Sequence, residues 1–102
     1  MGLKKMIVVT AKMKVKPASK YDFLVETEPL IKHTRSEKGC ISYNLYTDID
    51  DPNQLVMLEF WKDMDALDAH MDTVHFKTFG KAISKYLTGE IEISKFDAQS
   101  LE

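Results

Sequence analysis

The 102-residue sequence has one cysteine, Cys40, four glycines and three prolines. A single cysteine excludes an internal disulfide framework and a cysteine cluster around a metal ion. It is typical of a reducing compartment, so we expect a cytoplasmic protein. No linker or low-complexity tract interrupts the chain, which predicts a single domain over residues 1–102 with its core at about residues 6–96.

Long apolar runs and a strong charge of either sign are also absent. No stretch approaches the roughly 20 apolar residues that cross a bilayer, so we expect no membrane association. The formal net charge of −2 argues against nucleic acid as a partner, because phosphate binding needs a basic surface. The ends, Met1-Gly2 and Leu101-Glu102, stay outside the functional interpretation, since a terminal Leu-Glu often precedes a purification tag.

The apolar pattern of the remaining chain changes period several times. Alternation typical of strands occurs at residues 6–16, 40–47, 54–61 and 90–96, and helical spacing occurs at residues 19–37 and 63–86. Pro29 should kink or split the first helix, and a break near Asp72-Thr73, with Thr73 as a cap, should divide the second. The order predicts an α+β, ferredoxin-like βαββαβ fold with one antiparallel sheet and the helices on one face.

The third strand, residues 54–61, is apolar on both faces. Leu55 and Met57 alternate with Val56 and Leu58. The helices can cover only one face of so small a sheet, so the other face needs a second sheet against it. A second copy of the chain is the simplest source, and we therefore predict a homodimer that forms through the sheet face.

Rare and titratable side chains gather between Glu59 and Phe79. This stretch holds two of the three histidines, His70 and His75, and the only tryptophan. We expect both histidines on the flanks of apolar helical stripes, at the edge of a pocket between helix and sheet. An imidazole there can take a proton from an acidic hydroxyl, because its ordinary pKa is near neutrality. The alternative is a boundary histidine that caps a helix or binds a carbonyl.

The spacing of the histidines predicts no metal site. His70 and His75 are five residues apart, which places them on different faces of one continuous helix. No His-Glu-x-x-His pattern and no nearby cysteine completes a ligand set.

Neighbouring aromatic and polar side chains are candidates for binding a substrate. These candidates are Trp61, Phe76, Phe79, Tyr43, Asn44 and Glu59. Each has a structural alternative, because aromatic rings pack in cores and sheets. A strand carboxylate such as Glu59 could instead pair with a strand lysine such as Lys12.

The same stretch resembles the antibiotic biosynthesis monooxygenase (ABM) family. The resembling segments are Glu59-Phe60-Trp61, Lys62-Asp63, Ala66-Leu67, Ala69-His70 and His75-Phe76-Lys77, and upstream residues 37–43. The resemblance extends from Met6 to Phe96. It implies the dimeric α/β barrel that is typical of this family.

Within the family, the quinol-monooxygenase branch is the most similar. It implies that O₂ oxidises a small phenolic or quinol-type aromatic substrate without metal, flavin or haem. His70 or His75 would be the catalytic base, and Trp61 and Phe76 would form apolar walls. Two alternatives stay open, because one scaffold can host several functions. They are an acid–base isomerase of a small phosphorylated or carbonyl metabolite, and a non-catalytic dimer that binds a small molecule.

Overall fold

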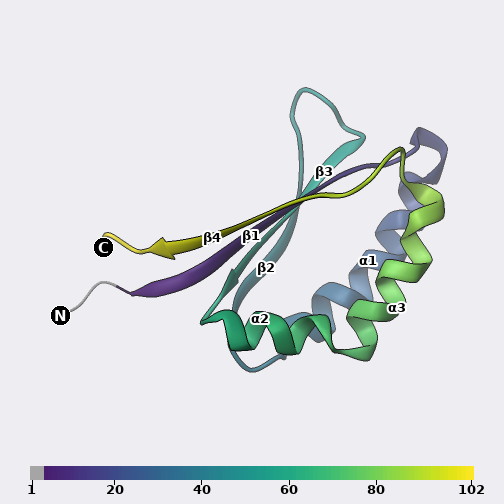
Figure 1. Ribbon diagram of the computed structural model, residues 1–102. Helices are drawn as coiled ribbons and strands as arrows, with labels where there is room; N and C mark the ends of the chain where they lie inside the picture. Colours follow the sequence, from purple (N-terminus) through teal and green to yellow (C-terminus); the bar gives the residue numbers. More distant parts are fainter. Residues whose placement is uncertain (1–3) are drawn as a thin grey trace.

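The computed structural model describes residues 4–102 and shows one four-stranded antiparallel sheet with the helices on one face (Figure 1). The strands are β1 (Lys5–Lys14), β2 (Cys40–Thr47), β3 (Gln54–Trp61) and β4 (Glu92–Gln99), and the helices are α1 (Lys20–Arg35), α2 (Met64–Met71) and α3 (Val74–Ile83). The strand order is β2-β3-β1-β4. The predicted ferredoxin-like α+β fold is confirmed. Among residues 4–102, no helix has the length and apolar character needed to cross a membrane.

The two central strand predictions, residues 40–47 and 54–61, match β2 and β3. The outer strands differ by a few residues, since β1 ends at Lys14 and β4 runs two to three residues later than predicted. The chain leaves the sheet after Lys14 because Lys16 donates its backbone N–H to the Tyr86 carbonyl, at 2.8 Å. The end of β1 therefore depends on a contact with Tyr86, which follows α3 in the chain. The alternation of apolar residues alone does not reveal this contact.

Helix α1 is continuous through Pro29, so of the two predicted outcomes, a kink or a split, the split does not occur. Proline removes the hydrogen bond to the carbonyl four residues earlier, which belongs to Val25. Both Pro29 and Val25 are exposed, so water can take the place of the missing donor. The solvent side of the helix is where such a defect costs least.

The predicted break between α2 and α3 is confirmed, and side-chain caps hold it. Asp63 accepts a hydrogen bond from the Ala66 backbone N–H at the start of α2, at 2.9 Å. Thr73 accepts from the Phe76 N–H at the start of α3, at 3.2 Å, and its hydroxyl donates to the His70 carbonyl at 2.7 Å. These caps satisfy backbone groups that helix ends leave free. The break turns α3 away from the axis of α2.

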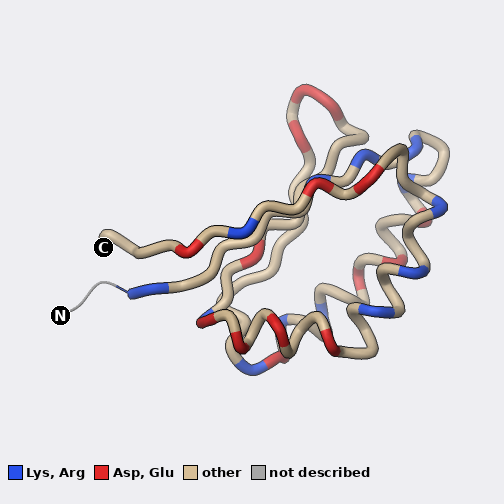
Figure 2. The backbone as a smooth tube through the Cα atoms, viewed as in Figure 1, with Lys and Arg blue, Asp and Glu red and all other residues tan. Residues whose placement is uncertain are grey.

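Charged residues are distributed along the whole described backbone (Figure 2). Acidic residues crowd the β2–β3 turn and α2, and basic residues recur along α3. The core lies between the helices and the inner face of the sheet and is mostly apolar. Glu59 and His70 are exceptions, because both are buried there. Burying such groups is costly unless they are paired or neutral, so their surroundings identify a candidate site.

Candidate functional site

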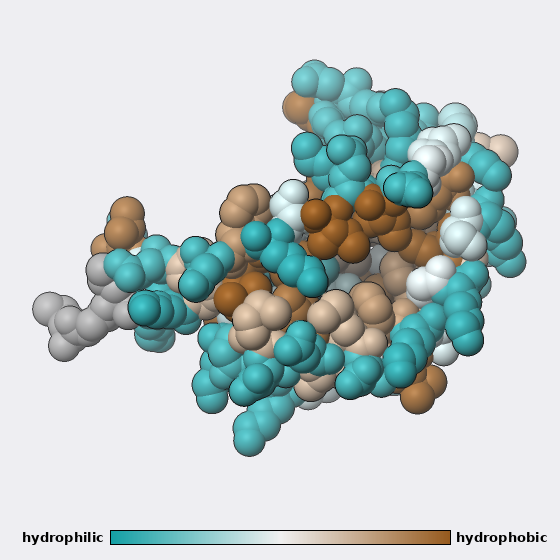
Figure 3. Space-filling view, in the orientation of Figure 1, coloured by the Kyte–Doolittle hydropathy of each residue, from teal (hydrophilic) through white to brown (hydrophobic). Residues whose placement is uncertain are grey.

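A cavity of about 140 Å³ lies between the inner face of the sheet and helices α2 and α3. Its lining is largely apolar, and the side chains around this hollow give the apolar surface seen in Figure 3. Four lining residues carry polar groups: Tyr43, Glu59, His70 and Lys95. A small apolar hollow with a few convergent polar groups is the usual form of a small-molecule site.

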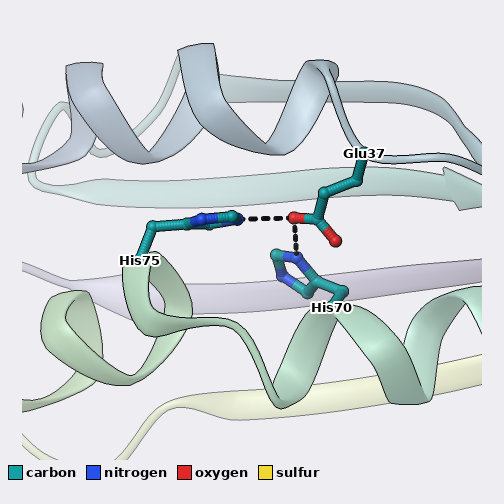
Figure 4. A group of neighbouring side chains, drawn as sticks. All are labelled: Glu37, His70 and His75. Carbon is teal, nitrogen blue, oxygen red and sulfur yellow. Dashed lines mark hydrogen bonds and ion pairs between the residues drawn. The ribbon is translucent and has the colours of Figure 1, made fainter.

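His70 is 1% exposed and lies against the cavity. Its Nδ1 is 2.7 Å from Oε2 of Glu37 (Figure 4). A carboxylate only accepts hydrogen bonds, so Nδ1 carries the hydrogen and Nε2 of the neutral ring carries the lone pair. Nε2 is buried and has no hydrogen-bond partner among residues 4–102. The ring therefore presents an unused proton acceptor beside an apolar hollow.

Aromatic rings hold the His70 imidazole in place. Ring centroids lie 4.7 Å away for Trp61, 4.9 Å for Phe76 and 5.5 Å for Tyr43. Burial lowers the pKa of His70 below its ordinary 6.5, although the hydrogen bond that the ring donates to Glu37 acts in the opposite direction. The imidazole is thus a neutral base over a wide pH range.

Glu37 was not among the predicted site residues. It lies in the turn between α1 and β2, two residues before Gly39. Gly39 has φ = 90°, and a Cβ there would come within 2.5 Å of the Ala66 side chain on α2. The glycine lets the turn press against α2, which brings Glu37 to His70. The sequence shows the helix stop at Gly39 but not the helix that it meets.

His75 lies on the other side of Glu37. Its Nε2 is 2.6 Å from the same Oε2 atom, and its side chain is 23% exposed (Figure 4). It lines an open groove of about 460 Å³ between α1 and α3, where it stacks on His33 with ring centroids 5.6 Å apart. The structure therefore does not bring His70 and His75 into one pocket. His70 is also not on the flank of its helix's apolar stripe, as was expected, because it lies one turn after buried Leu67 and is itself buried.

The spacing argument against a shared ligand set is wrong. It assumed one continuous helix, whereas α2 ends at Met71 and α3 begins at Val74. The break lets both imidazoles converge on Glu37, and one ligand atom from each of the three residues lies within 4.8 Å of the others. These residues are the part of the described chain that could hold a metal ion.

Glu59 and Trp61 form a second buried pair. The indole Nε1 of Trp61 donates to Oε1 of Glu59 at 2.9 Å. Burial raises the pKa of Glu59 to about 7, and the indole hydrogen bond only partly offsets that rise. The alternative pairing with Lys12 is not formed, because Lys12 lies opposite Val56 and Glu59 lies opposite Val9 in the sheet. Trp61 is fully buried and packs against the His70 ring, with centroids 4.7 Å apart, but it does not line the cavity.

The remaining candidates divide between the two sides of the sheet. Tyr43, Phe76 and Phe79 line the cavity, and burial raises the pKa of the Tyr43 hydroxyl. Phe79 also lines the outer groove, so its ring separates the two hollows. Asn44 does not line the cavity, because it alternates with Tyr43 along β2 and lies opposite Leu58 on the outer face; its Oδ1 accepts a hydrogen bond from Arg35 Nη2 at 2.6 Å.

Fold and site together define a class of protein: a small ferredoxin-like domain that holds a neutral, carboxylate-bound imidazole against an apolar cavity. A sequence profile described as antibiotic biosynthesis monooxygenase matches residues 6–82. The chain belongs to the antibiotic biosynthesis monooxygenase family.

Relatives agree with this assignment. The Bacillus subtilis (strain 168) protein named "Putative monooxygenase YcnE" is 38% identical over 88 residues, which cover 86% of this chain and 93% of that protein. A conserved protein from Methanosarcina mazei Go1 has a TM-score of 0.89 and 39% identity, covering 90% of this chain and 91% of that one. Rv0793 from Mycobacterium tuberculosis has a TM-score of 0.86 and 26% identity, covering 91% and 94%.

Proposed function

We propose that this protein is a monooxygenase that oxidises a small phenolic or quinol-type aromatic substrate with O₂, using His70 as the base. The observation that supports this role is the buried Nε2 of His70, which has no hydrogen-bond partner within residues 4–102, on a ring that lines an apolar cavity. A neutral imidazole can accept a phenolic proton there, and the Glu37 carboxylate stabilises the imidazolium that results. Cofactor independence and a cytoplasmic location stay predictions from the sequence.

The proposed reaction converts a phenol and O₂ into a quinone and water. His70 takes the phenolic proton, and the electron-rich phenolate reacts with O₂ to form a C–O bond at a ring carbon that carries a hydrogen, para to the oxygen in a simple phenol and ortho to it in a hydroquinone. The peroxide accepts the proton from His70. His70 then removes the hydrogen of that carbon while the O–O bond breaks, and the departing hydroxide leaves as water. The substrate supplies the electrons, and the protein holds the ring, moves the protons and excludes water.

The cavity favours a substrate with one aromatic ring. An apolar cavity of about 150 Å³ accommodates benzene, and the volume here is about 140 Å³. The volume is below the roughly 300 Å³ that a drug-sized ligand needs. Glu59 also lines the cavity and can hydrogen-bond a second oxygen of a quinol, because near neutral pH its carboxyl is partly protonated.

The alternatives fit these surroundings less well. A phosphorylated metabolite needs several cationic or N–H donors, and Lys95 is the one cation in the cavity lining among residues 4–102. For a non-catalytic dimer we expected a filled pocket and histidines bonded to backbone. Instead, both ring nitrogens that have partners, Nδ1 of His70 and Nε2 of His75, bond to Glu37, and the cavity is hollow.

We also propose a homodimer through the outer face of the sheet. This face carries the side chains of Val8, Val56, Leu58 and Phe60, which alternate with the buried inner residues and have no helix over them. A contiguous apolar sheet face favours a partner with a like face. Light scattering should give a dimer for the natural chain and a monomer for Leu58→Lys; an unchanged mass in the variant would contradict the proposal.

Oxygen uptake with a panel of phenols and hydroquinones tests the function. One-ring substrates should be consumed with one O₂ per molecule and should yield quinones by mass spectrometry, and two-ring substrates should react more slowly. The variant His70→Ala should lose this activity, whereas His33→Ala, in the outer groove, should retain it. No oxygen uptake by the natural chain, or full activity in His70→Ala, would rule the proposal out.

A further inference from the structure

We propose that Glu37, His70 and His75 also form a binding site for a divalent transition metal ion of borderline softness, with Zn²⁺ as the representative ion. The three residues supply two imidazole nitrogens and one carboxylate oxygen. This is a donor set that zinc and its neighbours bind in proteins. Binding itself does not depend on the proposed oxidation.

The geometry is close to what such an ion needs. In the hydrogen-bonded state, Oε2 of Glu37 is 2.7 Å from Nδ1 of His70 and 2.6 Å from Nε2 of His75. An ion with ligand distances of about 2.1 Å would push these atoms apart to roughly 3.4 Å in a tetrahedral arrangement. Glu37 can withdraw by that amount because it lies in a turn and is partly exposed, at 13%.

The ligands are positioned before any ion arrives. The Thr73 side chain caps α3 and bonds the His70 carbonyl at the end of α2, so it fixes the angle between the two helices. That angle directs both imidazoles to one point (Figure 4). A preformed site avoids the ordering cost that a flexible cluster would have to overcome.

The groove between α1 and α3 gives the ion a route from solvent. His75 forms part of its wall together with Glu26 and His33, two further side chains with metal-binding atoms. With three protein ligands, one coordination position remains for water on this side. The apolar cavity lies on the opposite side of His70 and is not needed for entry.

Metal binding and base catalysis exclude each other at His70, and this consequence rests on the proposed function. An ion on Nδ1 displaces the hydrogen that Glu37 accepts, so the neutral ring must carry its hydrogen on Nε2. That atom then can no longer accept a proton from a substrate. Zn²⁺ should therefore inhibit turnover, and a chelator should restore it.

Calorimetric titration with Zn²⁺, on protein without a polyhistidine tag, measures the binding. We expect one ion per chain, and about 100-fold weaker binding in His75→Ala and in Glu37→Gln. The matched control is His33→Phe, which keeps an aromatic ring against His75 but removes a metal-binding atom; it should bind Zn²⁺ like the natural chain. Circular dichroism confirms that each variant is folded.

Cobalt reports the ligand set without any activity assay. Co²⁺ should give visible absorption of the intensity expected for a four-coordinate nitrogen and oxygen site, and this signal should disappear in His75→Ala. Equal Zn²⁺ affinity in the natural chain, His75→Ala and Glu37→Gln would overturn the proposal. So would a loss of binding in His33→Phe equal to that in His75→Ala, because it would place the ion on the surface histidines. If Zn²⁺ binds but no phenol is oxidised, the metal site stands and the oxidation fails.

Discussion

The enclosed cavity and the open groove differ more in environment than in chemistry. The groove is about three times larger, at about 460 Å³ against about 140 Å³, and each hollow contains one histidine bonded to Glu37. In the smaller hollow, burial lowers the pKa of His70 and raises the pKa of Glu59, because both side chains are withdrawn from water there. Enclosure therefore identifies the candidate site better than volume does.

His70 and His75 differ in the same way, because one is buried and the other is open to solvent. They share one carboxylate oxygen, yet His70 is 1% exposed and His75 is 23% exposed. The second nitrogen of the His70 ring is buried and has no hydrogen-bond partner in the described part of the chain, whereas the His75 ring lies in a wall open to solvent. Identical side chains with a common partner thus have different surroundings, which are set by the helices that carry them.

Replacing each histidine with glutamine should produce the largest difference between the two hollows. We expect His70→Gln to lower kcat/KM by about 10²- to 10⁴-fold, because general base catalysis typically contributes that much. His75→Gln should lose roughly 10-fold or less, since it removes only a second donor to Glu37. Steady-state oxygen uptake with the same one-ring substrate measures both.

The pH profile separates a base from a merely structural histidine. Because the pKa of His70 is lowered by burial, kcat/KM should rise with pH below 6.5 and be level by about pH 7. Equal losses in the two glutamine variants, or a rate that keeps falling as pH rises from 5 to 7, would contradict the assignment to His70.

The fold was predictable because most of its evidence is local. Alternation located β2 and β3 to the residue, and the capping residues Asp63 and Thr73 located the starts of α2 and α3. Whether Pro29 would kink or split α1 was left open, since the effect of a proline depends on which side of the helix faces water. Such information belongs to the packed structure.

The candidate site was predictable in composition but not in arrangement. His70, Glu59 and Tyr43 were recognised from their residue types and their places on predicted elements. Glu37 was missed because it approaches His70 from 33 positions away, through the contact of Gly39 with α2. The break at Thr73 was expected, but its effect on the five-residue spacing could be judged only once the direction of α3 was known.

Glu59→Gln tests whether the cavity really withdraws a carboxyl group from water. The pKa of Glu59 is raised from the ordinary 4.5 to about 7, so the folded state binds more protons than the unfolded state between these values. Ionisation of Glu59 therefore lowers the free energy of unfolding as pH rises from 4.5 to above 7, by on the order of 3 kcal/mol. A glutamine amide does not ionise, so the free energy of unfolding of the Glu59→Gln variant should not fall in this way.

Urea unfolding at several pH values from 4.5 to 8 measures the difference. Relative to the natural chain, the variant should gain stability steadily over this range. The matched control is Glu92→Gln, which replaces an exposed carboxyl group on β4 and should change the pH dependence little. Parallel curves for the natural chain and Glu59→Gln would show that the cavity admits enough water to solvate the carboxylate.

Phe79→Ala should remove the wall between the two hollows. The Phe79 ring lines both and packs edge-on against Phe23, with centroids 6.3 Å apart. Phenylalanine truncation in a core costs about 3 to 5 kcal/mol, and we expect about 2 to 3 kcal/mol because this ring is partly exposed. Water entering through the groove should also weaken the effect of burial on His70, so the pKa that kcat/KM reports at low pH should move nearer to 6.5. Phe79→Leu, which keeps an apolar wall, should have less than half of either effect; equal effects in both variants would show that the ring does not separate the hollows.

Thr73→Ala should have the smallest effect on stability but a specific one on geometry. Losing a helix cap costs about 1 kcal/mol, and Asp63→Ala removes the comparable cap of α2 at a similar cost. The two variants should differ in the histidines, because only Thr73 also bonds the His70 carbonyl between the two rings. We expect imidazole NMR signals of His70 and His75 to shift in Thr73→Ala and to stay in place in Asp63→Ala.

Both variants could instead leave these signals unchanged. The convergence of the histidines on Glu37 would then not depend on the Thr73 cap, and the packing of α3 against α1 would position the two rings.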